Sequence, residues 1–141
     1  MDLAPSADLY LGPMRHFTPL VPADRQRVPT ARLVHLELHT PDRAAARALY
    51  RELLGWRAAT VAGPYVALDL GGDVGGGIVE CGTERSMWLP YVEVEEVSAC
   101  TASALRLGAK VLLEPREGPA GWRSVVATEA GGELAMWQPR S

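Results

Sequence analysis

The stretch RLVHLELHTPD, Arg32 to Asp42, alternates between apolar and polar side chains from Val34 to His39. Because successive side chains of a β-strand point to opposite faces, this alternation predicts a strand with one apolar and one polar face. The apolar face would carry Val34, Leu36 and Leu38. The polar face would carry His35, Glu37 and His39. A strand face with three ionisable groups is a candidate functional site.

A helix is expected to follow this strand directly. Thr40-Pro41 is typical of a helix start, with threonine as the N-cap and proline at the first helical position. The segment DRAAARALYRELLG repeats apolar side chains at helical spacing, and Gly55 is expected to end it in a left-handed conformation. After Trp56, YVALDL and GGGIVEC predict two short strands around a glycine turn at 71–73.

The second half of the chain repeats this order, so that each half is predicted to be a strand, a helix and then about three strands. LPYVEVE predicts a strand, residues 98–107 a helix capped by Gly108, and AKVLLEP, WRSVVAT and ELAMWQ three further strands. The chain therefore contains an internal repeat of about 50 residues, and modules of this kind usually bury their open sides against each other.

Composition restricts the class of protein. The chain has 141 residues, 48% of them hydrophobic and 22% charged, which fits one globular domain with a full core. A net charge of -3 gives no electrostatic reason to expect nucleic acid or an anionic membrane. We see no membrane span and no signal peptide, so a cytoplasmic protein is expected. Cys81 and Cys100 lack metal-ligand spacing and are expected to be buried thiols.

Residues 1–30 differ from the rest of the chain. Prolines at positions 5, 13, 19, 22 and 29 are incompatible with a helix interior or a central strand, although several apolar side chains lie between them. We expect a proline-rich N-terminal arm over residues 1–30 that lies on the body or on a partner subunit. A single domain should then cover residues 31–141, with one module at 31–83 and the other at 86–139.

The motifs HLELHTPDRAAARALYRELLGW, GGGIVE and WLPYVEVEEV, together with GWRSVVATEAGGELAMWQP, resemble the vicinal oxygen chelate superfamily of glyoxalases, bleomycin-resistance proteins and extradiol dioxygenases. The resemblance covers about residues 32–139. It implies an α+β fold in which two βαβββ modules form a half-open, curled mixed sheet around a cleft, with the helices outside. It also implies a homodimer.

The resemblance indicates which face of the first strand lies beneath the helix and which faces the cleft. Helices pack on the outer face of such a sheet, so the apolar row should lie beneath the helix and the polar row should face the cleft. We predict His35, Glu37 and Glu93 as an acid-base set, because a histidine beside a carboxylate titrates near neutral pH and a desolvated carboxylate has a raised pKa. Arg123 could meet an anionic group, although solvation is the more common fate of an isolated arginine. The predicted substrate-binding residues are His39, Tyr65, Trp88, Tyr91, Trp122 and Trp137.

A metal site is not expected. His35 stands at the family's first ligand position, but the corresponding positions in the second module and the last strand hold Leu89 and Ala135, which cannot ligate. No cofactor is therefore expected; if a divalent metal is bound, His35 with Glu37 or Glu80 would hold it.

Several functions follow from these residues and the resemblance. The first is a metal-independent enzyme of isomerase, cyclase or lyase type acting on an aromatic or polyketide-like metabolite, as in secondary metabolism. The second is an antibiotic-resistance protein of the bleomycin-resistance type, which would sequester a hydrophobic or cationic ligand near Glu37, Glu93 and Glu95. A metal-dependent glyoxalase or dioxygenase, and a subunit with a vestigial cleft, are further alternatives.

Overall fold

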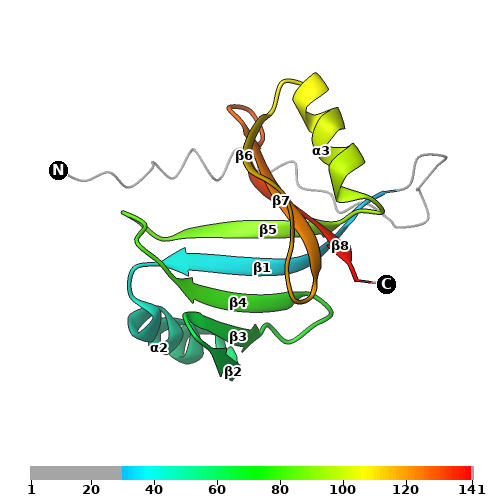
Figure 1. Cartoon of the computed structure of the whole chain (residues 1–141). Coiled ribbons are helices and arrows are strands. Elements are labelled where there is room, and N and C mark those ends of the chain that lie inside the picture. The colour runs from blue at the N-terminus through cyan, green and yellow to red at the C-terminus, as the bar shows by residue number, and fades with distance from the viewer. Residues whose placement is uncertain (1–29, 141) are drawn as a thin grey trace, which may run out of the picture. The chain divides into compact units, whose positions relative to one another are not determined.

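The computed structural model describes residues 30–140 (Figure 1). The proline-rich arm predicted for residues 1–30 therefore lies, apart from Thr30, outside the described residues.

Two βαβββ modules follow each other along the described chain. The first contains β1 (Arg32–Thr40), α2 (Arg43–Leu54), β2 (Arg57–Ala62), β3 (Tyr65–Asp69) and β4 (Gly75–Glu80). The second contains β5 (Met87–Glu93), α3 (Val97–Arg106), β6 (Lys110–Glu117), β7 (Gly121–Thr128) and β8 (Gly132–Pro139). This is the repeat that the sequence predicts.

All eight strands form one mixed sheet in the order β2-β3-β4-β1-β5-β8-β7-β6. The two modules join at the centre, where β1 pairs antiparallel with β5, and each module closes with a parallel pair, β1 with β4 and β5 with β8. Figure 1 shows β6, β7 and β8 turned across β4, β1 and β5, so that the sheet is curled. The predicted α+β fold of two βαβββ modules is confirmed.

Helix α2 begins two residues later than predicted. Asp42, rather than Thr40, is the N-cap, and its Oδ1 accepts a hydrogen bond from the backbone N–H of Ala45 at 3.0 Å. Thr40 still contributes, because its hydroxyl accepts from the backbone N–H of Asp42 at 3.2 Å. Gly55 ends the helix with φ of 73°, as predicted.

The two faces of the sheet carry different apolar clusters. On the helix side, Leu38, Leu68 and Ile78 are buried beneath α2 together with an aromatic group. That group consists of Tyr50, Trp56 and Trp88, whose ring centroids lie 5.5 to 6.1 Å apart. On the opposite face, a second cluster is formed by Leu89, Tyr91, Val125 and Ala135, with Val34, Leu113 and Trp137 packed against it.

An irregularity in β1 changes the face of one predicted residue. The pairing of β1 with β5 shifts between Leu33, opposite Val92, and His35, opposite Tyr91, so Val34 is an extra residue in the ladder. A bulge of this kind breaks the strict alternation of side chains. Val34 therefore packs with the cluster opposite the helix, and its predicted place beneath α2 is wrong. Leu38, beyond the bulge, lies on the helix side as predicted.

Candidate active site

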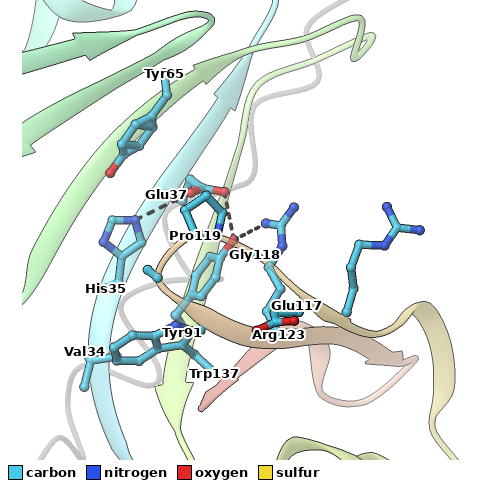
Figure 2. A pocket seen from close by; sticks show the side chains of 13 residues that line it. Val34, His35, Glu37, Tyr65, Tyr91, Glu117, Gly118, Pro119, Arg123 and Trp137 are labelled. Carbon is cyan, nitrogen blue, oxygen red and sulfur yellow. Dashed lines mark hydrogen bonds and ion pairs between the residues drawn. The ribbon is translucent and has the colours of Figure 1, made fainter. Parts of the chain in front are cut away.

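A pocket of about 720 Å³ lies on the face of the sheet opposite α2 (Figure 2). Both modules contribute to it, and the tip of the β6–β7 hairpin forms one wall. The lining residues are Val34, His35, Glu37, Tyr65, Tyr91, Arg116, Glu117, Gly118, Pro119, Ala120, Gly121, Arg123 and Trp137. Its size suits a small organic molecule.

Glu37 is the centre of the polar side of this pocket. Its Oε1 lies 2.8 Å from Nε2 of His39 and accepts a hydrogen bond from the Tyr91 hydroxyl at 3.0 Å, while its Oε2 lies 3.6 Å from Nε2 of His35. Nε2 of His35 and Nε2 of His39 thus both approach the same carboxylate. An ionised carboxylate can only accept hydrogen bonds, so His39 Nε2 must be the donor.

The acidity of Glu37 is opposite to what the sequence predicts. Burial alone would raise the pKa of this carboxyl group, but hydrogen bonding by His35, His39 and Tyr91, with the charge of His39, lowers it from 4.5 to about 2. The expectation of a raised pKa considered desolvation without the donors that converge on the carboxylate. Glu37 is therefore ionised at neutral pH and is not a proton donor there.

Arg123 extends this network from the second module. Its Nη1 donates to the Tyr91 hydroxyl at 2.8 Å, so that Tyr91 accepts from Arg123 and donates to Glu37 (Figure 2). Burial and the nearby Glu37 charge raise the pKa of Tyr91 to about 12, which keeps the phenol neutral. Solvation is the fate expected from the sequence for Arg123; in the structure it is exposed but lines the pocket and is hydrogen bonded to Tyr91. Its position on β7 beside Tyr91 depends on strand pairing that no local pattern shows.

Two glycines of β4, Gly75 and Gly77, provide the space in which His35 and Tyr65 lie. A Cβ at Gly77 would lie 2.5 Å from the Tyr65 ring, and one at Gly75 would lie 3.1 Å from Nδ1 of His35. Gly76 is buried and equally close to Leu70 and to the backbone of Leu68. The sequence predicts a glycine turn at 71–73 before this strand, and the structure shows which side chains the glycines of the strand itself accommodate. Burial, with the charge of Glu37, raises the pKa of Tyr65.

The hairpin tip is held by the end of the domain. Nη1 of Arg140 pairs with Oε2 of Glu117 at 2.7 Å, and its Nη2 donates to the carbonyl oxygen of Gly118 at 2.7 Å. The backbone N–H of Gly118 donates to the carbonyl oxygen of Gly121 at 2.7 Å and closes the turn. These contacts fix the hairpin wall relative to β8.

Several predicted site residues do not line the pocket. Trp88 packs against Tyr50 and Trp56 on the helix side, so its expected place at the cleft rim is wrong. Trp122 is 40% exposed and lies outside the pocket, next to the lining residues Gly121 and Arg123. Glu93 pairs with Arg32 at 3.6 Å at the end of β5 and does not join the predicted acid-base set. His39 touches the pocket only through Glu37.

The residues present do not fit the metal centre that the fold implies. Leu89 and Ala135, at the family's ligand positions, are 3% and 0% exposed and belong to the apolar cluster beneath the pocket. Oε1 of Glu80, considered as an alternative ligand, accepts from the backbone N–H of Arg43 at the start of α2. Within residues 30–140, no three histidine, cysteine, aspartate or glutamate side chains are grouped so that they could hold a metal ion.

No protein-family model and no curated protein sequence matches the chain. Solved structures share its fold. A methylmalonyl-CoA epimerase from Streptomyces coelicolor, in complex with 2-nitronate-propionyl-CoA, superposes with a TM-score of 0.61 at 16% identity, over 80% of this chain and 97% of that one. For the methylmalonyl-CoA epimerase from Mycobacterium tuberculosis the TM-score is 0.56 at 14% identity, over 77% of this chain and 88% of that one. An NAD-dependent benzaldehyde dehydrogenase from Legionella pneumophila gives 0.56 at 11% identity, over 75% and 98%.

These similarities show the fold of the chain. It is the fold expected from the resemblance of its motifs to the vicinal oxygen chelate superfamily. Identities this low carry no reaction from those proteins to this chain. Neither α2 nor α3, the two helices described here, is long and apolar enough to cross a membrane.

The lowered pKa of Glu37 predicts a loss of stability in acid. Since the unfolded chain takes up this proton near pH 4.5 and the folded chain only near pH 2, the stabilisation is complete above pH 4.5 and disappears as the pH falls to about 2. Glu37→Gln should therefore be less stable than wild type at neutral pH, and the difference should shrink across this interval. Denaturant unfolding at several pH values measures it. A difference independent of pH would contradict the ionised, hydrogen-bonded carboxylate.

Proposed function

We propose that this chain is a metal-independent enzyme that moves a proton on a small aromatic or polyketide-like metabolite, as isomerases, cyclases and lyases do. The observation that supports this proposal most strongly is the pairing of His35 with Glu37 at the pocket. Glu37 is held ionised by hydrogen bonds, and His35 lines the pocket with one ring nitrogen toward that carboxylate.

His35 would act as the general base. If its Nε2–H points to Glu37, the lone pair of Nδ1 is left to accept a proton. Nδ1 lies toward Gly75 of β4, where a Cβ would come within 3.1 Å of it, and the ring of His35 lines the pocket. Glu37 would orient the ring and stabilise the positive charge that forms on it, as carboxylates beside catalytic histidines do.

The reaction would start from a carbon acid. Nδ1 of His35 takes the proton next to a carbonyl group, and the electron pair of the broken C–H bond moves into the carbonyl to form an enolate. The imidazolium can return the proton to another carbon, which is an isomerisation. Alternatively, the enolate collapses with loss of a group from the neighbouring carbon, which is a lyase reaction. Neither course requires a metal or a redox cofactor.

The pocket walls support an aromatic or hydrophobic substrate. Tyr65, Trp137, Val34 and Pro119 give the pocket apolar walls. Its polar and charged lining groups are His35, Glu37 and Tyr91 together with Arg116, Glu117 and Arg123 of the β6–β7 hairpin. Aromatic walls favour planar ligands held by stacking. Cytoplasmic localisation and a homodimer remain part of the proposal, and sedimentation velocity would test the dimer.

Sequestration of a cationic ligand has less support. Glu37 already accepts hydrogen bonds from His39 and Tyr91 and lies 3.6 Å from Nε2 of His35, Glu93 is paired with Arg32, and Glu95 is exposed outside the pocket. A cation would therefore have to displace existing partners of Glu37. A sequestering protein for neutral or anionic compounds is the alternative that an experiment must separate from the enzyme.

Proton exchange in deuterium oxide provides that experiment. Benzoylacetone, phenylpyruvate and mandelate are incubated with the protein, and the signal of the proton next to each carbonyl group is followed by NMR. We expect exchange above the buffer rate for at least one compound, and loss of that excess in His35→Gln. Compounds that bind but neither exchange nor change mass would instead indicate sequestration and reject the enzyme.

A further inference from the structure

Two arginines lie opposite each other where the β6–β7 hairpin reaches the pocket. Arg116 on β6 pairs in register with Arg123 on β7, and both line the pocket. Like charges directly across a strand pair destabilise it, so this arrangement is unfavourable unless an anion lies near both groups.

The carboxylates near these arginines are already engaged. Glu117 lines the pocket beside Arg116, but it is paired with Arg140 at 2.7 Å. Glu37 is on the other side of the Tyr91 hydroxyl, which lies between it and Arg123. Among residues 30–140, Arg116 makes no ion pair, and Arg123 donates only to the Tyr91 hydroxyl.

The guanidinium groups retain donors for a ligand. Arg123 uses one N–H on Tyr91, and a guanidinium group has five in a planar fork that matches a carboxylate. The aromatic wall formed by Tyr65 and Trp137 belongs to the same pocket, so one molecule could meet both features.

We propose that the ligand of this pocket is an aromatic carboxylate whose carboxyl group binds between Arg116 and Arg123, while its apolar body lies against Tyr65 and Trp137. This inference rests on the proposed function in taking the same pocket as the substrate site. It adds the charge and orientation of the substrate: the carboxylate is directed to the hairpin, and the ring lies toward the His35 side.

The test compares 1-naphthoate with 1-naphthamide by isothermal titration calorimetry on the full chain. The two probes have the same ring system and nearly the same shape, and differ in charge. We expect the naphthoate to bind at least about tenfold more tightly, as charge-assisted hydrogen bonds to arginine require. Arg123→Gln and Arg116→Gln should each reduce this preference at least about threefold, and Arg123→Lys should retain part of it.

Arg106→Gln is the matched control, because Arg106 is exposed on α3, donates to Ser103 and does not line the pocket. Its probe affinities should equal those of wild type. Thermal unfolding of each variant shows whether a lost preference for naphthoate over naphthamide reflects a lost fold. Arg116 is exposed on the hairpin, so Arg116→Gln should fold as wild type does. Equal affinities for the two probes, or no binding of the naphthoate in the millimolar range, would overturn the inference.

The proposed enzyme and this inference can fail separately. Naphthoate carries no proton on a carbon next to a carbonyl group, so its binding reports recognition alone. Naphthoate binding without proton exchange on any compound would reject the enzyme and keep the carboxylate site. Exchange on benzoylacetone together with equal binding of both naphthalene probes would reject the carboxylate site and keep the enzyme.

Discussion

Replacing Glu37 with glutamine is expected to lower the rate of proton exchange at least about a hundredfold while changing ligand affinity less than about tenfold. The amide keeps the shape of the side chain but removes the charge that would stabilise a protonated His35. It also brings N–H donors toward His39 and Tyr91, which donate to the carboxylate in wild type. The rate is measured in deuterium oxide on the compound that wild type exchanges fastest.

Glu52→Gln is the matched control, because Glu52 is exposed on α2, on the other side of the sheet. Its exchange rate should match wild type. Glu93→Gln adds a second comparison, since Glu93 belongs to the acid-base set predicted from the sequence but is paired with Arg32 in the structure. An unchanged rate in Glu37→Gln would remove Glu37 from the mechanism, and a large loss in Glu93→Gln would return Glu93 to it.

Replacing Gly121 with alanine is expected to lower the free energy of unfolding by about 2–3 kcal/mol, through overpacking and backbone strain. Gly121 is buried at the start of β7 with φ of 155°, and a Cβ there would collide with the carbonyl oxygen of Gln138 in β8. The strand pair can accept the methyl group only by moving apart. Thermal unfolding should show a midpoint lowered by roughly 10 °C.

The control for this change is Gly72→Ala in the exposed turn before β4. No atom lies within 4 Å of a Cβ built at Gly72, and its φ is outside the left-handed region. Its stability should stay within about 0.5 kcal/mol of wild type. Gly121 is the first residue of β7, and the tip of the β6–β7 hairpin forms a pocket wall. Gly121→Ala should therefore weaken naphthoate binding as well. A Gly121→Ala protein as stable as Gly72→Ala would show that β7 and β8 are not packed as described.

Local patterns in the sequence are sufficient to predict most of the fold. The alternation in β1, the helical spacing after Asp42 and the glycine at 55 each depend on residues close together in the chain, so their signals survive without tertiary information. The repeat of these elements indicates the pairing of two modules. The same alternation places His35 and Glu37 on the pocket face, which the structure bears out.

The site itself depends on contacts between distant parts of the chain. The bulge at Val34 is an irregularity in the pairing with β5, and a shift by one residue moves a side chain to the other face. The placement of Trp88 beneath α2 is local by contrast, because it follows from the alternation in β5, whose Leu89 and Tyr91 face the opposite side of the sheet. Arg123 reaches Tyr91, 32 residues earlier, because β7 and β5 both flank β8.

The sequence by itself determined the two βαβββ modules and the polar row of β1, because periodicity and capping act over a few residues. Only the tertiary structure decided which groups surround that row. His39 and Tyr91 meet the Glu37 carboxylate together with His35, and this convergence reverses the expected direction of its pKa. Arg116 and Arg123 meet at the pocket because the hairpin folds over the sheet. Electrostatic environment depends on distances in space between groups far apart in the chain, and no pattern along the chain encodes those distances directly.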